Sequence, residues 1–361
     1  MSWRLLAGAI TLSLLLVHPV LAQDAALLDV GVVIFDPGVA EDVAVPAAAG
    51  VFPEIRRAES RYLPVSLRRL LEDTGEWGVV RVLPHGGSLS EVLVEARILE
   101  STGQSQRLDV VVTDATGRVW LQREYQDQAQ ASDYPVPAGS HPFIDLYREL
   151  AADLLAARQG LTAQRLRDIR RVALMRYAAD LSPEAFASYL SAGGAQPYQL
   201  QRLPARDDPM IERVMRIRNQ EYLFIDNVDE QYGRLHDEMA PTYALWLQYD
   251  REQSLFTSDY TQRAAGREKQ GKRGSFAAMQ QNYYAYRSYR LQQQGLEELA
   301  TGFNNETAPT LLETQGRVFR LTGTLDNQYA EWRGILREIF ALEMGLPAAG
   351  ESINDFATPP Q

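Results

Sequence analysis

The chain contains no cysteine in its 361 residues, so no disulfide bond can hold its fold together. Its stability must come from packing, and the lack of thiols also excludes thiol chemistry. Hydrophobic residues make up 45% of the chain and charged residues 23%. This composition is typical of a globular protein with enough apolar material for one large or two medium domains.

The first 22 residues have the pattern of a secretory leader. Arg4 supplies the positive end, Leu5–Val17 is an unbroken apolar run, and Pro19 precedes a small residue at the expected cleavage site, Ala22. The apolar run is much shorter than the roughly 20 residues that span a membrane. We therefore expect a cleaved signal peptide and no transmembrane segment after its removal.

Gln23 follows the expected cleavage site, where a bacterial lipoprotein would need a cysteine. The sequence therefore predicts a mature protein without a lipid anchor, located in the periplasm of a Gram-negative cell. Secretion further out is the alternative. The net charge of −11 argues against nucleic acid as the main partner, because phosphate binding depends on clustered cations.

The first half of the mature chain alternates between strand and helix patterns. Short apolar runs bounded by turn residues favour strands, and apolar side chains at helical spacing favour amphipathic helices. This order predicts an α+β fold with a mixed sheet and helices on one face. The expected elements are a strand in Leu27–Phe35, a helix in two pieces that meet near Pro64, strands at Gly78–Leu83, Glu91–Leu99, Leu108–Thr113 and Arg118–Tyr125, and a helix at Pro142–Arg158.

The segments TGEWGVVRVLP and DATGRVWLQREY carry a resemblance to a known domain type. With the flanking strand and helices, they resemble the small α+β domain of Gram-negative envelope proteins. Examples are the curli-secretion lipoprotein, the amino-terminal domain of the Tol-system β-propeller protein and transporter-associated auxiliary lipoproteins. The resemblance covers about Leu27–Arg158, and the whole mature chain also resembles a group of proteobacterial envelope proteins. It implies assembly and partner binding in the envelope, and it transfers no site residues.

The second half has a mainly helical pattern that ends in a hairpin and a further helix. Thr162 is a good cap for one helix, and Ser182 and Pro183 are typical of the start of another. A long helix is expected from Pro209, with an interruption at Pro241. Further elements are a short strand at Tyr198–Leu203, a hairpin around Gln315-Gly316, and a helix that begins at Thr324 or Asp326 and ends at Gly345.

These patterns predict six segments. They are a signal peptide at 1–22, an α+β domain at 23–160, a helical region at 161–265, a basic flexible link at 266–274, a helix with the hairpin and terminal helix at 275–345, and a disordered tail at 346–361.

One dense cationic stretch is the candidate interaction surface. It continues into a helix in which tyrosines and arginines interleave, a pattern that binds sugars or nucleobases when exposed and packs a core when buried. The stretch could bind an anionic lipid or cell-wall surface, because each cation near such a surface adds about 1 kcal/mol to binding. The simpler interpretation is that the same stretch is a solvated loop. The candidate residues are Arg267, Lys269, Lys272, Arg273, Tyr284 and Arg287.

Residue patterns of catalytic or metal sites are missing. His85 and His141 lie beside prolines and read as polar loop groups, and His236 stands alone among carboxylates, without the histidine spacing of a zinc site. Neither Gly-x-Ser-x-Gly nor Ser-x-x-Lys occurs. A glycosidase needs only two well-placed carboxylates, and 47 acidic residues leave that alternative open. No catalytic residue, metal site or cofactor is predicted.

Two functions are therefore compatible with the sequence. The first, which we favour, is an exported non-catalytic accessory protein of the cell envelope that binds envelope proteins, with peripheral membrane or cell-wall contact. The alternative is a periplasmic hydrolase or binding protein that acts on cell-wall polymer. An enzyme is expected to show a pocket with converging carboxylates of raised pKa. An interaction protein is expected to expose an apolar patch or a sheet edge.

Overall fold

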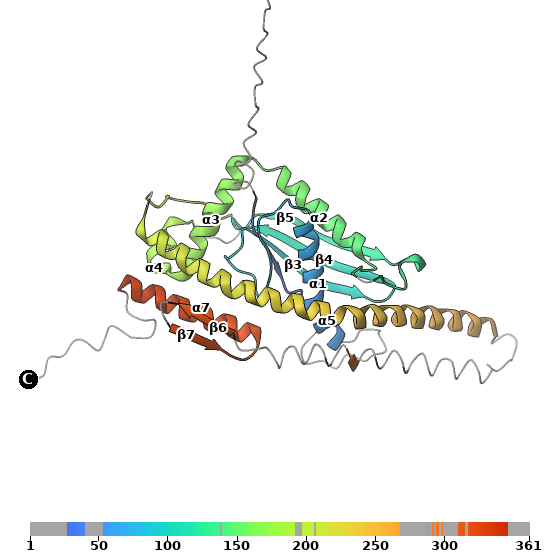
Figure 1. The fold of residues 1–361 in the computed structure, drawn as a ribbon. Helices are drawn as coiled ribbons and strands as arrows, with labels where there is room; N and C mark the ends of the chain where they lie inside the picture. The colour runs from blue at the N-terminus through green and yellow to red at the C-terminus, as the bar shows by residue number, and fades with distance from the viewer. Residues whose placement is uncertain are drawn as a thin grey trace, which may run out of the picture.

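The computed structural model shows an α+β protein in which a mixed sheet precedes a helix-rich region, a hairpin and a terminal helix (Figure 1). The predicted fold class is confirmed. The structure describes residues 27–39, 53–137, 139–191, 197–205, 207–267, 310–314 and 317–345, with single helical positions at 287, 291, 294, 295 and 298.

The sheet has five strands in the order β2-β1-β3-β4-β5. The strand β1 is parallel to both of its neighbours, whereas β3, β4 and β5 form an antiparallel meander. The tight turn predicted between the last two strands is present, with Gly117 at φ 80°. The strands are β1 (Val30–Val33), β2 (Val80–Leu83), β3 (Val92–Ser101), β4 (Ser105–Asp114) and β5 (Val119–Gln128).

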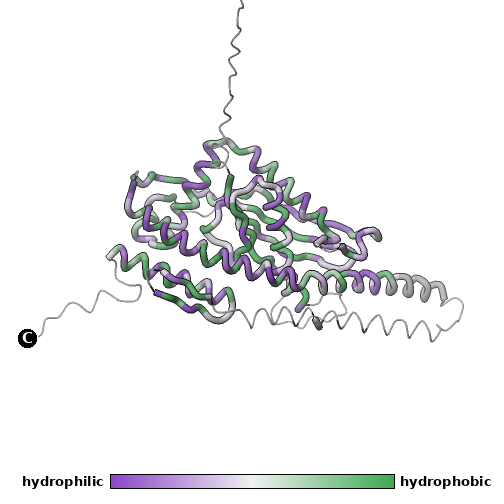
Figure 2. The backbone as a smooth tube through the Cα atoms, viewed as in Figure 1, coloured by the Kyte–Doolittle hydropathy of each residue, from purple (hydrophilic) through white to green (hydrophobic). Residues whose placement is uncertain are grey.

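One face of this sheet is apolar and the other is polar. Along β3 and β4 every second side chain is buried, for example Val94 and Val110. The helices α1 (Pro53–Asp73) and α2 (Ile144–Gln159) share one apolar cluster with these buried side chains. On the opposite face Arg107 pairs across strands with Glu124 at 3.1 Å. The helices thus cover one face, as predicted, and Figure 2 shows hydrophobic colour concentrated in the central strands.

The helix α1 is continuous, so the predicted division near Pro64 is wrong. A proline inside a helix removes one N–H and leaves the carbonyl four residues earlier without its usual partner. Here that carbonyl belongs to Ser60, and it accepts a hydrogen bond from the backbone N–H of Phe35 at 2.9 Å. A tertiary contact therefore satisfies the group that would otherwise disfavour the helix.

The helix α5 (Pro209–Arg267) is also continuous, with Pro241 in its interior, so the predicted interruption is wrong. The strand expected at Tyr198–Leu203 is also wrong, because Leu200 forms only an isolated bridge with Leu190. The helix predicted to start at Ser182 and Pro183 is present as the short α4 (Pro183–Phe186), and a 3₁₀ turn follows it.

The edge strand β2 is covered by α5. The backbone N–H of Val82 donates to Oδ1 of Asp229 at 2.8 Å, and Nε of Arg81 lies 2.6 Å from Oδ1 of Asp226. A side-chain carboxylate therefore takes the place of a neighbouring strand at this edge. Such a cover prevents edge-to-edge pairing with other chains.

The remaining elements pack around the first half of α5, with the hairpin and α7 on the side away from the sheet (Figure 1). The helix α3 (Ala163–Leu181) is capped by Thr162, as predicted. The hairpin β6 (Thr310–Thr314) and β7 (Arg317–Leu321) precedes α7 (Leu325–Met344), whose first turn is capped by Thr324. These elements share a second apolar cluster with the first half of α5, whereas the middle of α5 belongs to the cluster of the sheet. In the described part of the chain, no helix is sufficiently long and apolar to cross a membrane.

Candidate functional site

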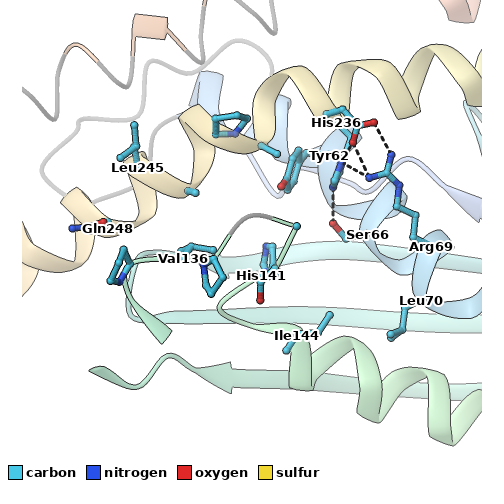
Figure 3. A pocket seen from close by; sticks show the side chains of 18 of the residues that line it. Tyr62, Ser66, Arg69, Leu70, Val136, His141, Ile144, His236, Leu245 and Gln248 are labelled. Carbon is cyan, nitrogen blue, oxygen red and sulfur yellow. Dashed lines mark hydrogen bonds and ion pairs between the residues drawn. The ribbon is translucent and has the colours of Figure 1, made fainter. Parts of the chain in front are cut away.

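A pocket of about 660 Å³ lies between α1, α5 and the loop that precedes α2 (Figure 3). It is lined by His141 from that loop and by His236 from α5, so it collects two of the four histidines of the chain. The ring of Tyr62 lies flat on the ring of His236, with centroids 4.2 Å apart. Pockets of this size with a few polar groups are typical of small-molecule sites.

Three residues of the pocket have the connectivity of a serine hydrolase triad. Oγ of Ser66 lies 3.2 Å from Nε2 of His236, and Nδ1 of His236 lies 3.2 Å from Oδ1 of Asp237. In a hydrolase the histidine accepts the serine proton at Nε2, because Nδ1 carries a proton and donates it to the carboxylate. The tautomer of His236 therefore decides whether this arrangement can activate Ser66.

Arg69 and Asp237 favour opposite tautomers of His236. The guanidinium of Arg69 binds Asp237 through two hydrogen bonds, at 2.8 and 3.1 Å, and Nη1 also lies 3.1 Å from Nδ1 of His236. A guanidinium only donates, so the contact with Arg69 requires the ring proton on Nε2, whereas a hydrogen bond to Oδ1 of Asp237 requires it on Nδ1. Burial lowers the pKa of His236, which keeps the ring neutral. With the proton on Nε2, Ser66 accepts a hydrogen bond from His236 and is not activated, and in both tautomers the contacts link α1 to α5.

His141 is buried below the same pocket. The backbone N–H of Phe143 donates to its Nδ1 at 3.2 Å, which places the ring proton on Nε2. Among the described residues, Nε2 has no hydrogen-bond partner. Burial lowers the pKa of His141 to about 3, so the ring is neutral at physiological pH. His141 therefore presents one buried donor whose acceptor is missing.

A buried polar network adjoins the ring cluster. Glu59 accepts hydrogen bonds at Oε1 from Ser101 at 2.6 Å and from Tyr243 at 2.7 Å. Tyr147 continues the network by donating to Gln106 at 2.8 Å. These residues come from five elements (α1, β3, β4, α2 and α5). Burial raises the pKa of Glu59, although Arg56, Ser101 and Tyr243 oppose that shift.

The raised pKa of Glu59 gives a testable dependence of stability on pH. When the pKa of an acid is higher in the folded chain than in the unfolded chain, the folded chain loses stability as the pH rises above the ordinary pKa of that acid. For Glu59 this ordinary pKa is 4.5. Glu59→Gln keeps the acceptor oxygen and removes this titration. We expect the variant to gain stability relative to the unmodified protein between pH 4.5 and pH 8, by on the order of 1 kcal/mol. Urea unfolding at both pH values measures the difference.

Glu95→Gln is the matched control, because Glu95 is exposed on the polar face of the sheet. Its stability relative to the unmodified protein is expected to be the same at both pH values. A Glu59→Gln variant with the same lack of pH dependence would show that Glu59 is not held in a desolvated site.

The interaction residues predicted from the sequence lie away from this pocket. Arg267 is the last residue of α5, and Arg287 is an exposed helical position. That surface stays a prediction, because Lys269, Lys272, Arg273 and Tyr284 lie outside the described residues.

Histidine placement is the main difference from the sequence analysis. His141 is buried, not a polar loop group, whereas His85 is half-exposed and lies 3.7 Å from Asp326. The described residues include no group of three or more histidines and acidic residues that could hold a metal ion. The pocket residues carry no sequence motif that could have marked them.

Comparison with known protein families gives no match, and comparison with curated proteins gives none either. The pocket geometry and the arrangement of the helices are therefore the observations from which function can be argued.

Proposed function

We propose that this protein is an exported, non-catalytic accessory protein of the bacterial cell envelope that binds a partner protein through its helical half. The observation that carries the proposal is the length of α5 relative to the body of the fold. The helix has 59 residues and extends about 88 Å, whereas the longest strands have 10 residues and extend about 33 Å.

The far end of α5 extends beyond the sheet (Figure 1). Two residues near this end contact the body: Asp250 accepts from the backbone N–H of Gly103 at 2.7 Å, and Arg251 lies over the ring of Tyr134. Residues 252–267 continue for about 24 Å. Leu255 in this part is 46% exposed. An extended helix that exposes a leucine suits partner binding better than it suits catalysis.

The pocket gives less support to the alternative of a cell-wall hydrolase. Such an enzyme needs an acid of raised pKa opposite a second carboxylate. Of the acidic residues that line the pocket, Asp237 is bound to Arg69, which lowers its pKa. Glu59 has a raised pKa but does not line the pocket. At Nδ1 of His236, Arg69 competes with the hydrogen bond to Asp237 that a catalytic triad with Ser66 needs.

Site-specific photocrosslinking in living cells tests the proposal. A photoreactive phenylalanine analogue at Leu255 or Ser258, both exposed on the far part of α5, is expected to give one adduct of defined mass with an envelope protein. The same analogue at Gln122 or Gln126, exposed on β5, is the control and is expected to give no such adduct. Equal crosslinking from both surfaces would contradict a role of the helical end.

Two further measurements test the other parts of the proposal. Intact-mass analysis of the protein from a periplasmic fraction is expected to give a mature chain that begins at Gln23. Recovery of the uncleaved chain from the cytosol would overturn export. Turnover of peptidoglycan by the purified protein, abolished by one carboxylate substitution, or labelling of Ser66 by a fluorophosphonate, would overturn the non-catalytic assignment.

A further inference from the structure

We infer that the pocket between α1, α5 and the loop before α2 binds a neutral, largely apolar molecule that carries one carbonyl oxygen. This binding site is independent of the partner surface on the far end of α5. It follows from three properties of the pocket: its apolar wall, its unused donor and its charge.

The wall of the pocket is apolar on two sides. Pro135, Val136 and Pro137 contribute from the loop, and Ala244 and Leu245 contribute from α5 (Figure 3). Leu245 is 45% exposed and adds an accessible apolar side chain to this wall. The volume of about 660 Å³ is within the range that holds a drug-sized molecule.

His141 determines which polar group such a molecule carries. Its Nδ1 is occupied by the backbone N–H of Phe143, so Nε2 holds the proton and can only donate. Nε2 has no acceptor among the described residues, and a buried donor without an acceptor is costly. The complementary group is therefore a hydrogen-bond acceptor, such as the oxygen of a ketone, ester or amide.

The charges of the lining residues exclude a strongly anionic ligand. The charged residues that line the pocket in the described chain are Arg69, Asp73 and Asp237. Arg69 is neutralised by its two hydrogen bonds with Asp237, so it offers no free cation to an anion. Both histidines are neutral, because burial lowers the pKa of each. A neutral carbonyl compound is the class that these groups fit.

The probe for the test is 6-propionyl-2-(dimethylamino)naphthalene, a neutral fluorescent naphthyl ketone. Its emission moves to shorter wavelength in apolar surroundings and responds to hydrogen bonding at the ketone. Titration into the full mature protein is expected to give saturable binding with one site and a dissociation constant in the micromolar range. Naphthalene that carries the dimethylamino group but no ketone is the comparison compound.

Ala244→Phe fills the pocket without removing any polar contact, and it is expected to weaken probe binding at least tenfold. Glu238→Phe is the matched control, because Glu238 is exposed on the same helix and does not line the pocket. It is expected to leave binding unchanged. Equal effects of both substitutions, or no saturable binding to the unmodified protein, would overturn the inference.

The role of His141 is tested with His141→Phe, which keeps a ring and removes the donor. The ketone is expected to lose about tenfold in affinity, whereas the comparison compound is expected to bind as before. An equal loss for both compounds would overturn the assignment of Nε2 as the donor. Circular dichroism shows whether this variant is folded, and Ala244→Phe keeps the location of the site testable if it is not.

Discussion

Asp114→Ala is expected to lower the free energy of unfolding by about 3–5 kcal/mol, because it removes a fully buried carboxylate that serves several donors. Asp114 accepts from the backbone N–H of Thr116 at 2.8 Å and from Nε1 of Trp120 at 3.0 Å. It also lies 3.5 Å from Nη2 of Arg165, at the beginning of α3. Removal of the carboxylate leaves the amide of Thr116 and the ring N–H of Trp120 without this acceptor. Arg165 loses its ion pair and keeps only its hydrogen bond to Oγ1 of Thr116 at 2.7 Å, so the contact between the β4–β5 turn and α3 is loosened. Urea unfolding measures the loss.

Asp109→Ala is the matched control on the same strand. Asp109 lies on the polar face of the sheet, opposite Glu124, so its removal also relieves a like-charge pair. The expected change in stability is within about 0.5 kcal/mol. If both variants lose the same stability, the buried carboxylate contributes no more than a surface residue.

Glu221→Ala is expected to cost about 3 kcal/mol and to loosen the attachment of α7. Glu221 on α5 accepts from the hydroxyl of Tyr177 on α3 at 2.8 Å and from the hydroxyl of Tyr329 on α7 at 2.6 Å. Arg333 adds an ion pair at 3.4 Å. Because Trp332 is fully buried in the same cluster, its fluorescence is expected to move to longer wavelength in the variant.

Glu230→Ala provides the comparison for this substitution. Glu230 is exposed on the same helix and pairs with Arg234 at 3.1 Å, a type of contact that contributes about 0.3–0.5 kcal/mol. Its unfolding midpoint and its tryptophan emission are expected to stay close to those of the unmodified protein. A Glu221→Ala variant with unchanged emission would contradict the role assigned to Glu221 in holding α7.

The strands and most helices could be predicted because their signals are local. Alternating side chains marked β3 and β4, the turn at Gly117 followed from its residue types, and Thr162 and Thr324 marked two helix starts. The errors at Pro64 and Pro241 arise because the outcome there depends on contacts that are not local. A proline is unfavourable in an isolated helix, but distant contacts decide whether a folded chain tolerates it. The backbone N–H of Phe35, which satisfies Ser60, belongs to another element.

The candidate site could not be predicted because its residues are far apart in the sequence. Glu59 and Tyr243 are 184 positions apart, and Ser66 and His236 are 170 positions apart. No periodicity connects such positions, and each residue by itself is an ordinary polar group. The role of Arg69 was even less accessible, because the tautomer of His236 depends on a distance of 3.1 Å between two helices.

The way in which β2 is closed has a consequence for the order in which the chain folds. The carboxylate of Asp229 comes 147 residues after the amide of Val82 that it binds. A chain that has formed all five strands therefore still has an open edge at β2 until α5 packs against it. During that interval a folding factor that shields the strand would prevent two partly folded chains from joining.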